Sequence, residues 1–410
     1  AERREELIPA QLAVPDEKLR LALSLGTIDN LLGRFEQAAG AFDHVLRGPV
    51  RIALQPHRSF AALGKARALV GHARDNESAA AESLASAKTA YLLSLGTLPD
   101  SAWHEHAQRE LALLIEVLAA RQPEALSAAR TQAKAEANMK PLAPSSADVR
   151  AAVEAARAEA LPYWEKLVGR SPASDYLPEA LYHAGVLFSE GAKPAAEKSV
   201  AAFERLTTEF PASPWAGDAH VRLIDVKLEQ QFDLPSAATH ARAAADWLAN
   251  VGNVGRNQRS AVPAQPADDL SSVSLPSLDQ TSYAIYLRAG LVAYLSERPA
   301  EAVEWFERAK PFEPERSFVV VHGEIPTGIE RLIAAARAGK SLTPEEARRG
   351  DEKARLILML ADVYLESEVH EKALELATLV IDKPKGTATP AQRSWAHRQR
   401  AVAHACLGLE

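Results

Sequence analysis

The triplet His104-Glu105-His106 contains residue types that bind zinc in many enzymes. On a helix, side chains two residues apart point about 200° away from each other, so these two imidazoles cannot share one ion. A helical zinc-protease site needs His-Glu-x-x-His, and Gln108 and Arg109 occupy the required region. We therefore interpret the triplet as part of a solvated helix face, and the sequence predicts no metal site.

The tripeptide Gly339-Lys340-Ser341 matches the end of a phosphate-binding loop. The first glycine of such a loop would fall at Ala334, and the segment follows a predicted helix rather than a strand. Without a glycine-rich loop the backbone cannot wrap a phosphate. The favoured interpretation is a glycine that ends a helix before a polar loop.

The other reactive residue types show no catalytic arrangement. The 12 histidines are scattered without ligand spacing, and no Gly-x-Ser-x-Gly turn occurs. The single cysteine, Cys406, lies in an apolar run and is expected to be a small buried side chain. Arg256 and Arg259 lie in a segment that we interpret as a solvated linker. The sequence thus predicts no catalytic residue and no cofactor, and it indicates a protein that is not an enzyme.

Composition limits the classes of partner. The 410 residues carry a formal net charge of −7, which disfavours nucleic acid as the partner because phosphate binding needs a basic surface. No stretch approaches the roughly 20 apolar residues of a membrane span, so we expect no direct membrane insertion. Aromatic residues make up only 6% of the chain, and alanine is abundant. Thin layers of closely packed helices suit this composition.

A helix-pair pattern stands out in residues 283–316. Gly290 is followed by Ala302 after twelve residues, by Phe306 after four more, and by Pro314 eight residues later. The two small residues let two antiparallel helices touch, the phenylalanine fills the contact, and the proline ends the second helix.

The same spacing recurs in other parts of the chain. Near the N-terminus Gly33 supplies the turn between two helices, and the middle segments repeat with a displacement of 39 residues. Ser174 and Ser213 are expected to cap the helices that follow them. The residues that carry the repeats are Gly26, Phe35, Ala38, Phe42 and Val45; Ala160, Trp164 and Leu167; Ser199, Phe203 and Leu206; and Ala361, Tyr364, Ala373, Ala377 and Val380.

This spacing resembles the tetratricopeptide repeat (TPR), in which a small residue on helix A meets a small residue on helix B. The resemblance implies an all-α fold, a TPR-like α-α superhelix of antiparallel helix pairs with irregular insertions. It also implies that the first helix of each pair, helix A, lines a concave groove where peptides bind.

The middle repeats also resemble bacterial envelope TPR proteins, of the outer-membrane assembly lipoprotein and Tol-system coordinator types. The basis is the turn at Pro172–Tyr176, which is similar to the turn at Pro211–Trp215. Together with a chain that starts at Ala1 rather than Met, this resemblance implies a periplasmic or envelope-associated protein. A cytoplasmic location is the alternative.

We expect TPR-like regions at residues 1–139, 147–249 and 281–410. Residues 250–280, rich in Gly, Asn, Ser, Pro and Asp, are predicted to be a flexible loop. An insertion is expected at 315–353, with an apolar β-prone run at Phe318–Val321, a helix at Ile329–Ala338, and another helix starting at Thr343.

The exposed helix-A positions are the candidate partner-binding residues, because they mix charge with tyrosine in the way of recognition surfaces. These candidates are Arg20, Asn30, Glu179, Tyr182, Asp225, Arg288, Tyr294, Arg355 and Asp362.

The leading hypothesis is a protein–protein interaction scaffold that binds a peptide or protein in the helix-A groove. Two alternatives stay open: the superhelical portion of a larger cell-wall enzyme, whose catalytic domain would lie beyond Glu410, and a cytoplasmic regulatory TPR array. The sequence does not indicate the oligomeric state.

Overall fold

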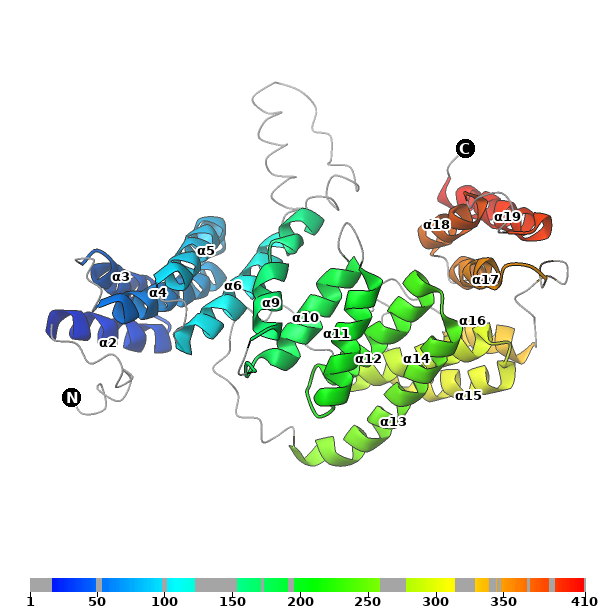
Figure 1. The fold of residues 1–410 in the computed structure, drawn as a ribbon, viewed down its shortest axis with the longest axis horizontal. Helices are drawn as coiled ribbons and strands as arrows, with labels where there is room; N and C mark the ends of the chain where they lie inside the picture. The colour runs from blue at the N-terminus through cyan, green and yellow to red at the C-terminus, as the bar shows by residue number, and fades with distance from the viewer. Residues whose placement is uncertain are drawn as a thin grey trace, which may run out of the picture. The chain divides into compact units, whose positions relative to one another are not determined.

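The computed structural model describes residues 17–48, 54–97, 102–121, 153–170, 173–190, 195–258, 278–313, 329–338, 344, 347, 349–366, 369–382 and 388–408. Helices account for 87% of these residues, and none of these residues belongs to a strand. The all-α fold class is thereby confirmed (Figure 1). None of the described helices is long and apolar enough to cross a membrane.

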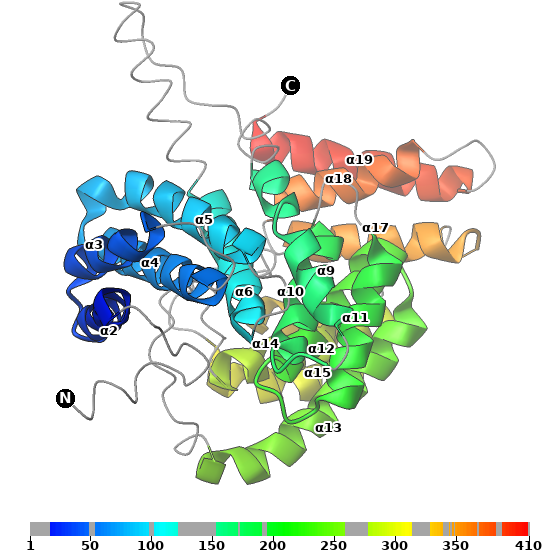
Figure 2. The same cartoon turned by 60° about the vertical axis from the view of Figure 1, so that its left-hand side comes forward.

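The described residues form two compact units, with the division between Ala195 and Ala196. In unit 1, each helix packs against the next one along the chain, and α2 to α6 lie side by side in two views (Figures 1 and 2). The helices of unit 1 are α2 (Glu17–Leu31), α3 (Phe35–Leu46), α4 (Gln55–Asp75), α5 (Ala80–Thr97), α6 (Ala102–Ala120), α9 (Leu161–Val168) and α10 (Leu177–Glu190).

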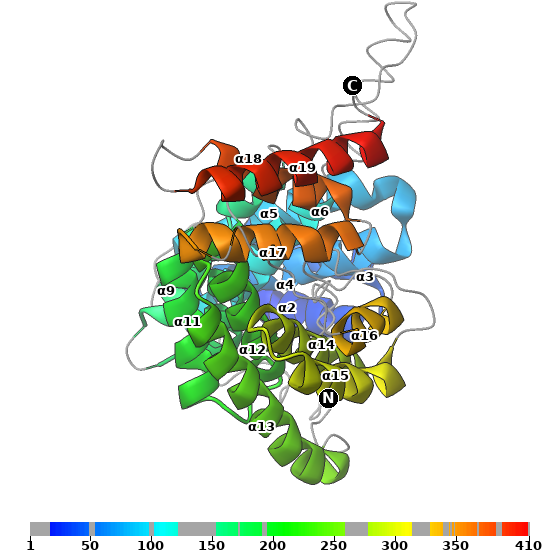
Figure 3. The same cartoon turned by 90° about the vertical axis from the view of Figure 1, so that its right-hand side faces the viewer.

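In unit 2 the helices also pack in sequence from α11 to α16 and from α17 to α19, and α17 contacts α14. Figure 3 shows α17, α18 and α19 as three neighbouring helices, and each of them contacts the other two. The helices of unit 2 are α11 (Ala196–Glu209), α12 (Ala216–Asp225), the π-helix η4 (Val226–Gln231), α13 (Leu234–Gln258), α14 (Leu278–Leu295), α15 (Pro299–Ala309), α16 (Ile329–Arg337), α17 (Glu352–Glu366), α18 (His370–Ile381) and α19 (Pro390–Leu407).

The predicted contact within the clearest helix pair is confirmed. Ala302 and Phe306 on α15 are fully buried, and the ring of Phe306 lies against Gly290 on α14, where a Cβ atom would collide with it. The same device occurs in unit 1, where a Cβ on Gly26 would lie 2.9 Å from the Phe42 ring. A glycine facing a phenylalanine therefore sets the distance between paired helices.

The 39-residue displacement between the middle repeats corresponds to equivalent structure. Trp164 and Phe203 are both fully buried. Ser174 Oγ accepts a hydrogen bond from the Tyr176 N–H at 3.2 Å, and Ser213 Oγ accepts one from the Trp215 N–H at 3.3 Å. Both serines stabilise the turn that leads into the next helix.

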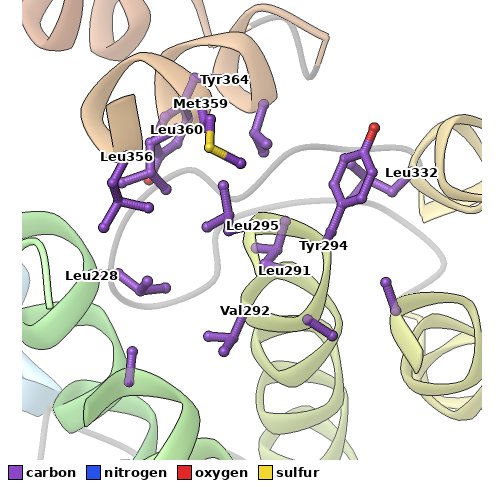
Figure 4. Close-up of a cluster of buried hydrophobic side chains, with 14 of the residues drawn as sticks. Leu228, Leu291, Val292, Tyr294, Leu295, Leu332, Leu356, Met359, Leu360 and Tyr364 are labelled. Atoms are coloured by element: carbon purple, nitrogen blue, oxygen red, sulfur yellow. The ribbon is translucent and has the colours of Figure 1, made fainter. Parts of the chain in front are cut away.

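Apolar side chains of η4, α14, α16 and α17 meet in the core of unit 2, together with those of neighbouring helices (Figure 4). Leu291 and Leu295 of α14 point toward Leu356 and Leu360 of α17, and Tyr294 points toward Leu332 of α16. Burial of these side chains holds α16 and α17 on α14.

Several predictions of local structure were wrong. Residues 250–258 continue the helix α13, and residues 278–280 begin α14, so the predicted loop does not include these positions. The helix that begins in the preceding alanine-rich stretch continues through the glycines at 252 and 255, because extending an existing helix costs less than starting one. Cys406 is exposed rather than buried.

Other predictions concern residues 315–353. The predicted helix at Ile329–Ala338 is confirmed as α16, and the next described helix begins at Glu352. Phe318–Val321, Thr343, Gly339-Lys340-Ser341 and residues 259–277 lie outside the described residues.

Candidate functional site

The structure does not present the predicted groove residues as an open surface. Of these residues, Arg20 is exposed; Asn30, Asp225, Arg355 and Asp362 are half-buried; and Glu179, Tyr182, Arg288 and Tyr294 are buried. The prediction of nine exposed positions is therefore wrong for four of them. The reason is packing. Helix α14 contacts α12, α13, α15 and α17, and α10 contacts α9 and is hydrogen-bonded to α6 through Glu179.

Many of these polar side chains connect the first helices of successive pairs instead. In unit 1, Asn30 of α2 donates to the Gly64 carbonyl of α4 at 3.2 Å. Arg109 of α6 donates to Glu179 of α10 through Nε (2.6 Å) and Nη2 (3.1 Å). Each of these bonds joins two layers of helices, and we call them interlayer bridges.

His104-Glu105-His106 takes part in the same kind of contact, so its interpretation as a solvated face was wrong. Glu105 accepts a hydrogen bond from Ser174 at 2.5 Å, and His106 Nδ1 lies 2.6 Å from the Tyr176 hydroxyl. The triplet ties α6 to the turn before α10. Among the described residues, no group of His, Cys, Asp and Glu gathers in a way that could hold a metal ion.

A second bridge in unit 1 surrounds a buried carboxylate. Glu116 accepts from Trp164 Nε1 at 2.7 Å, and its Oε1 lies 3.1 Å from His183 Nδ1. Burial would raise the pKa of Glu116, but the nearby His183 and the hydrogen bonds from His183 and Trp164 lower it below its ordinary value. The carboxylate therefore stays ionised and holds α6, α9 and α10 together.

Unit 2 contains the densest cluster of ionisable groups. Arg288 of α14 donates to Asp225 of α12 through Nε (2.6 Å) and Nη2 (2.7 Å). Tyr364 of α17 donates to Glu229 of η4 at 2.5 Å, and Lys372 Nζ of α18 lies 3.9 Å from Glu229. We call these five residues the η4 cluster.

The backbone of the η4 cluster is unusual. Residues 226–231 form a π-helix, and Phe232 then adopts the left-handed conformation with φ of 52°. A π-helix is wider than an α-helix, so it turns its side chains to directions that a regular α12 would not reach. This turn directs Glu229 toward Tyr364, a residue 135 positions away in the sequence.

The electrostatics of the cluster depend on burial. Burial alone would lower the pKa of Arg288, but Asp225, through its charge and its hydrogen bonds, together with Glu229, raises it above its usual value. Burial, followed by the charge of Asp225, raises the pKa of Glu229. Burial and Glu229 raise the pKa of Tyr364 well above its ordinary range, so this hydroxyl stays a hydrogen-bond donor.

An exposed surface of different chemistry lies on α19. This helix contains Arg393, Arg398 and Arg400 with His397 and His404, and it contains no Asp or Glu. Arg398 and His397 are exposed, and Arg400 is half-buried. Among the described residues, no carboxylate lies within ion-pair distance of Arg398 or Arg400. Arg398 and Arg400 are two residues apart, so they lie on opposite flanks of the exposed side of the helix, with His397 between them. We call this exposed side the α19 basic face.

The α19 basic face also has an apolar part and a well-fixed start. Val402 is 46% exposed, and Ala401 and Ala405 lie on the same side of the helix. Thr389 and Gln392 form a reciprocal capping box at the start of the helix, which orders its first turn. The sequence analysis missed this face, although an 18-residue helix without acidic residues in an acidic chain was a usable signal.

In comparisons with known proteins, no family model and no curated protein matches the chain.

Proposed function

We propose that this protein is a non-enzymatic scaffold that binds another protein, and that the α19 basic face is its docking surface. The partner segment is an acidic helix or peptide with an apolar stripe. The observation that carries the proposal is a cationic helix face, with Arg398 and Arg400 unmatched by described carboxylates, on a chain of net charge −7.

The chemistry of the face specifies the partner. Guanidinium groups bind carboxylates with two parallel hydrogen bonds, so glutamate or aspartate side chains fit Arg398 and Arg400. Val402, four residues after Arg398, offers an apolar contact beside that guanidinium. An amphipathic acidic segment satisfies both features, as in recognition of a helix by a shallow surface. Nucleic acid is disfavoured because the whole chain carries excess negative charge.

We keep the TPR-like superhelix as the proposed architecture, but we place the binding site on α19 instead of in the helix-A groove. Stacked helix pairs joined by interlayer bridges give a stable support on which one helix face is presented. The buried positions Tyr182 and Tyr294 serve the packing of the support, and the bacterial envelope setting rests on the resemblance of the middle repeats.

The test measures binding of a fluorescein-labelled, glutamate-rich amphipathic peptide to the full chain by fluorescence anisotropy. The double variant Arg398→Glu/Arg400→Glu is expected to weaken binding at least tenfold, about 1.4 kcal/mol. The matched control is Arg34→Glu/Arg47→Glu at the two ends of α3, which changes the net charge equally at exposed arginines. We expect this control to weaken binding by no more than about twofold.

Three results would overturn the proposal: no binding by the wild-type chain, equal weakening by the control variant, or equally tight binding of a single-stranded DNA oligonucleotide of similar length. The last result would identify a general polyanion surface. Raising the salt concentration should weaken peptide binding, since the contacts are exposed charges.

A further inference from the structure

A row of exposed apolar side chains runs along α2 at the start of unit 1. Leu21 is 51% exposed, Leu25 is 37% exposed, and Leu32 is 59% exposed, with the half-buried Ile28 between them. The backbone N–H of Leu32 donates to the Ile28 carbonyl at 3.0 Å, so this leucine continues the helical turn. We call these four residues the α2 stripe.

The α2 stripe is not the face that packs within unit 1. The opposite side of α2 is already used: Leu23 is fully buried, and Gly26 lies against the Phe42 ring of α3. Asn30 on this buried side bonds to α4. Thus α2 has two apolar faces, one that packs in the unit and one that the described residues leave exposed.

The spacing of the α2 stripe is that of a helix–helix seam. The steps of four, three and four residues between positions 21, 25, 28 and 32 keep the side chains on one line along the helix. Such a line interlocks with an equivalent line on a second helix. Exposed apolar side chains that form a line mark an interface more strongly than the same side chains scattered over a surface.

The charges beside the α2 stripe favour a second copy of this chain as its binding partner. Lys18 precedes Asp29 by eleven residues, which places both on the same flank of the helix, one near each end. When two α2 helices lie antiparallel, the start of each meets the end of the other. Lys18 of each copy then approaches Asp29 of the other copy, which also lies 3.7 Å from Arg34 of its own chain. The two Lys18–Asp29 contacts are attractive and are related by a two-fold axis.

We infer that the α2 stripe is a self-association surface, on which a second copy of this chain docks its own α2 in antiparallel orientation. A two-fold interface needs one surface that complements itself, and the stripe supplies this with its regular spacing and its opposite charges at opposite ends. The inference is independent of the proposed function, because it involves unit 1 and the α19 basic face belongs to unit 2.

The test is sedimentation equilibrium of the full chain over protein concentrations from about 1 to about 200 μM, which brackets micromolar affinities. We expect a species of about 88 kDa, twice the 44.2 kDa of the chain. Leu21→Glu/Leu32→Glu places four carboxylates in the interface and should weaken the dimer at least a hundredfold. Both positions are more than half exposed in the single chain, so circular dichroism should show intact folding.

The matched control is Leu92→Glu/Leu93→Glu on α5, where both leucines are 43% exposed in the same unit. This variant should dimerise like the wild type. A monomeric wild-type chain throughout the concentration range would overturn the inference, and a different partner or the chain before α2 would then be the occupant. A dimer that the α2 variant leaves intact would also overturn it.

Charge exchange tests the antiparallel arrangement even if the leucine variants misfold. Lys18→Glu alone and Asp29→Lys alone each place like charges together twice and should weaken the dimer about fivefold. An equimolar mixture of the two variants restores both attractive contacts and should recover wild-type affinity. If each single variant matches the wild type, or if the mixture fails to recover, the proposed arrangement is wrong.

Discussion

Arg109 in unit 1 and Arg288 in unit 2 hold equivalent places in the two halves of the chain. Each donates two hydrogen bonds from one first helix to a carboxylate on the neighbouring first helix. Both are buried, with 7% of Arg109 and 1% of Arg288 exposed. The two sites differ in the charges that surround the pair.

Arg109 forms a balanced pair. Its guanidinium faces Glu179 and lies over the ring of Tyr176, with 5.0 Å between the guanidinium carbon and the ring centroid. Arg288 faces Asp225 and also lies within the electrostatic influence of Glu229 and Asp218. The unit 2 site therefore gathers three acidic groups around Arg288, and two of them have a second cation: Lys372 lies 3.9 Å from Glu229, and Arg222 lies 3.9 Å from Asp218. The comparison shows that an interlayer bridge can be an isolated pair of opposite charges, as in unit 1, or part of a cluster with additional carboxylates, as in unit 2. We call the unit 2 site the loaded site.

The largest expected effect on stability comes from removing Arg288, the buried cation of the loaded site. Arg288→Met should destabilise the protein by about 3–5 kcal/mol, because it leaves Asp225 without its hydrogen-bonded counter-charge and removes a cation that also acts on Glu229 and Asp218. Arg109→Met should cost less, because it leaves Glu179 alone rather than several acids. Urea unfolding followed by circular dichroism measures both. If the two variants lose the same free energy of unfolding, the two sites do not differ in the way that we describe.

Removing both members of each pair sharpens the comparison. Arg109→Leu/Glu179→Leu should lie within about 1 kcal/mol of the wild type, since apolar replacement of a balanced buried pair is often neutral. Arg288→Leu/Asp225→Leu should remain destabilised by about 2 kcal/mol, because Glu229 and Asp218 lose one of the cations near them and keep only Lys372 and Arg222. The same unfolding experiment measures both values. If the unit 2 double variant is as stable as the wild type, the other carboxylates near Arg288 do not depend on its charge.

The sequence predicted the packing inside helix pairs better than the packing between them. Gly290, Ala302 and Phe306 lie within one short segment, so their spacing alone indicates a contact. The same pattern places Phe42 against Gly26. These contacts depend on local helix geometry, which sequence periodicity reports directly.

The candidate site could not be predicted in the same way. The periodicity identified the face of each first helix but not what covers it, so Glu179 and Arg288 were expected to be exposed. The π-helix at 226–231 has no sequence signal that we can identify, yet it brings Glu229 to Tyr364 across 135 positions. Such contacts depend on how distant helices stack, which a single sequence does not encode locally.

A smaller expected effect is the pH dependence contributed by Glu229. Its pKa is raised in the folded state above its unfolded value, mainly by burial and then by Asp225. Its stabilising contribution is therefore complete below the unfolded pKa and is lost as the pH rises through the folded pKa. The slope cannot exceed about 1.4 kcal/mol per pH unit for one group, and it should be lower because 31% of the side chain is exposed.

The pH measurement compares the wild type with Glu229→Gln. The difference between the two free energies of unfolding isolates Glu229, because His220 and His240 titrate in both proteins. Burial lowers the pKa of His220 to about 4, so His220 acts in the opposite direction and stabilises the fold less as the pH falls below its unfolded pKa. A wild-type-minus-variant difference that stays constant with pH would show that Glu229 is not perturbed.

The smallest expected effect concerns the hydroxyl of Tyr364, which donates to Glu229. Tyr364→Phe keeps the ring in the core beside Met359 and Leu360 (Figure 4) and removes one hydrogen bond, at a cost of about 1 kcal/mol. A hydrogen bond to an ionised carboxylate is stronger than one to a neutral carboxyl, so the cost should be larger at a pH above the raised pKa of Glu229 than at a pH below it.

Tyr91→Phe in unit 1 is the matched control for that substitution. The Tyr91 hydroxyl donates to Glu110 at 2.9 Å, and Glu110 keeps hydrogen bonds from Arg67 after the hydroxyl is removed. Its cost should therefore be similar at the two pH values, because the acceptor already has a strong cationic partner within a balanced bridge. If Tyr91→Phe shows the same pH dependence as Tyr364→Phe, the dependence is a general property of buried tyrosine–carboxylate hydrogen bonds in this protein. The different surroundings of Glu110 and Glu229 would then have no measurable effect.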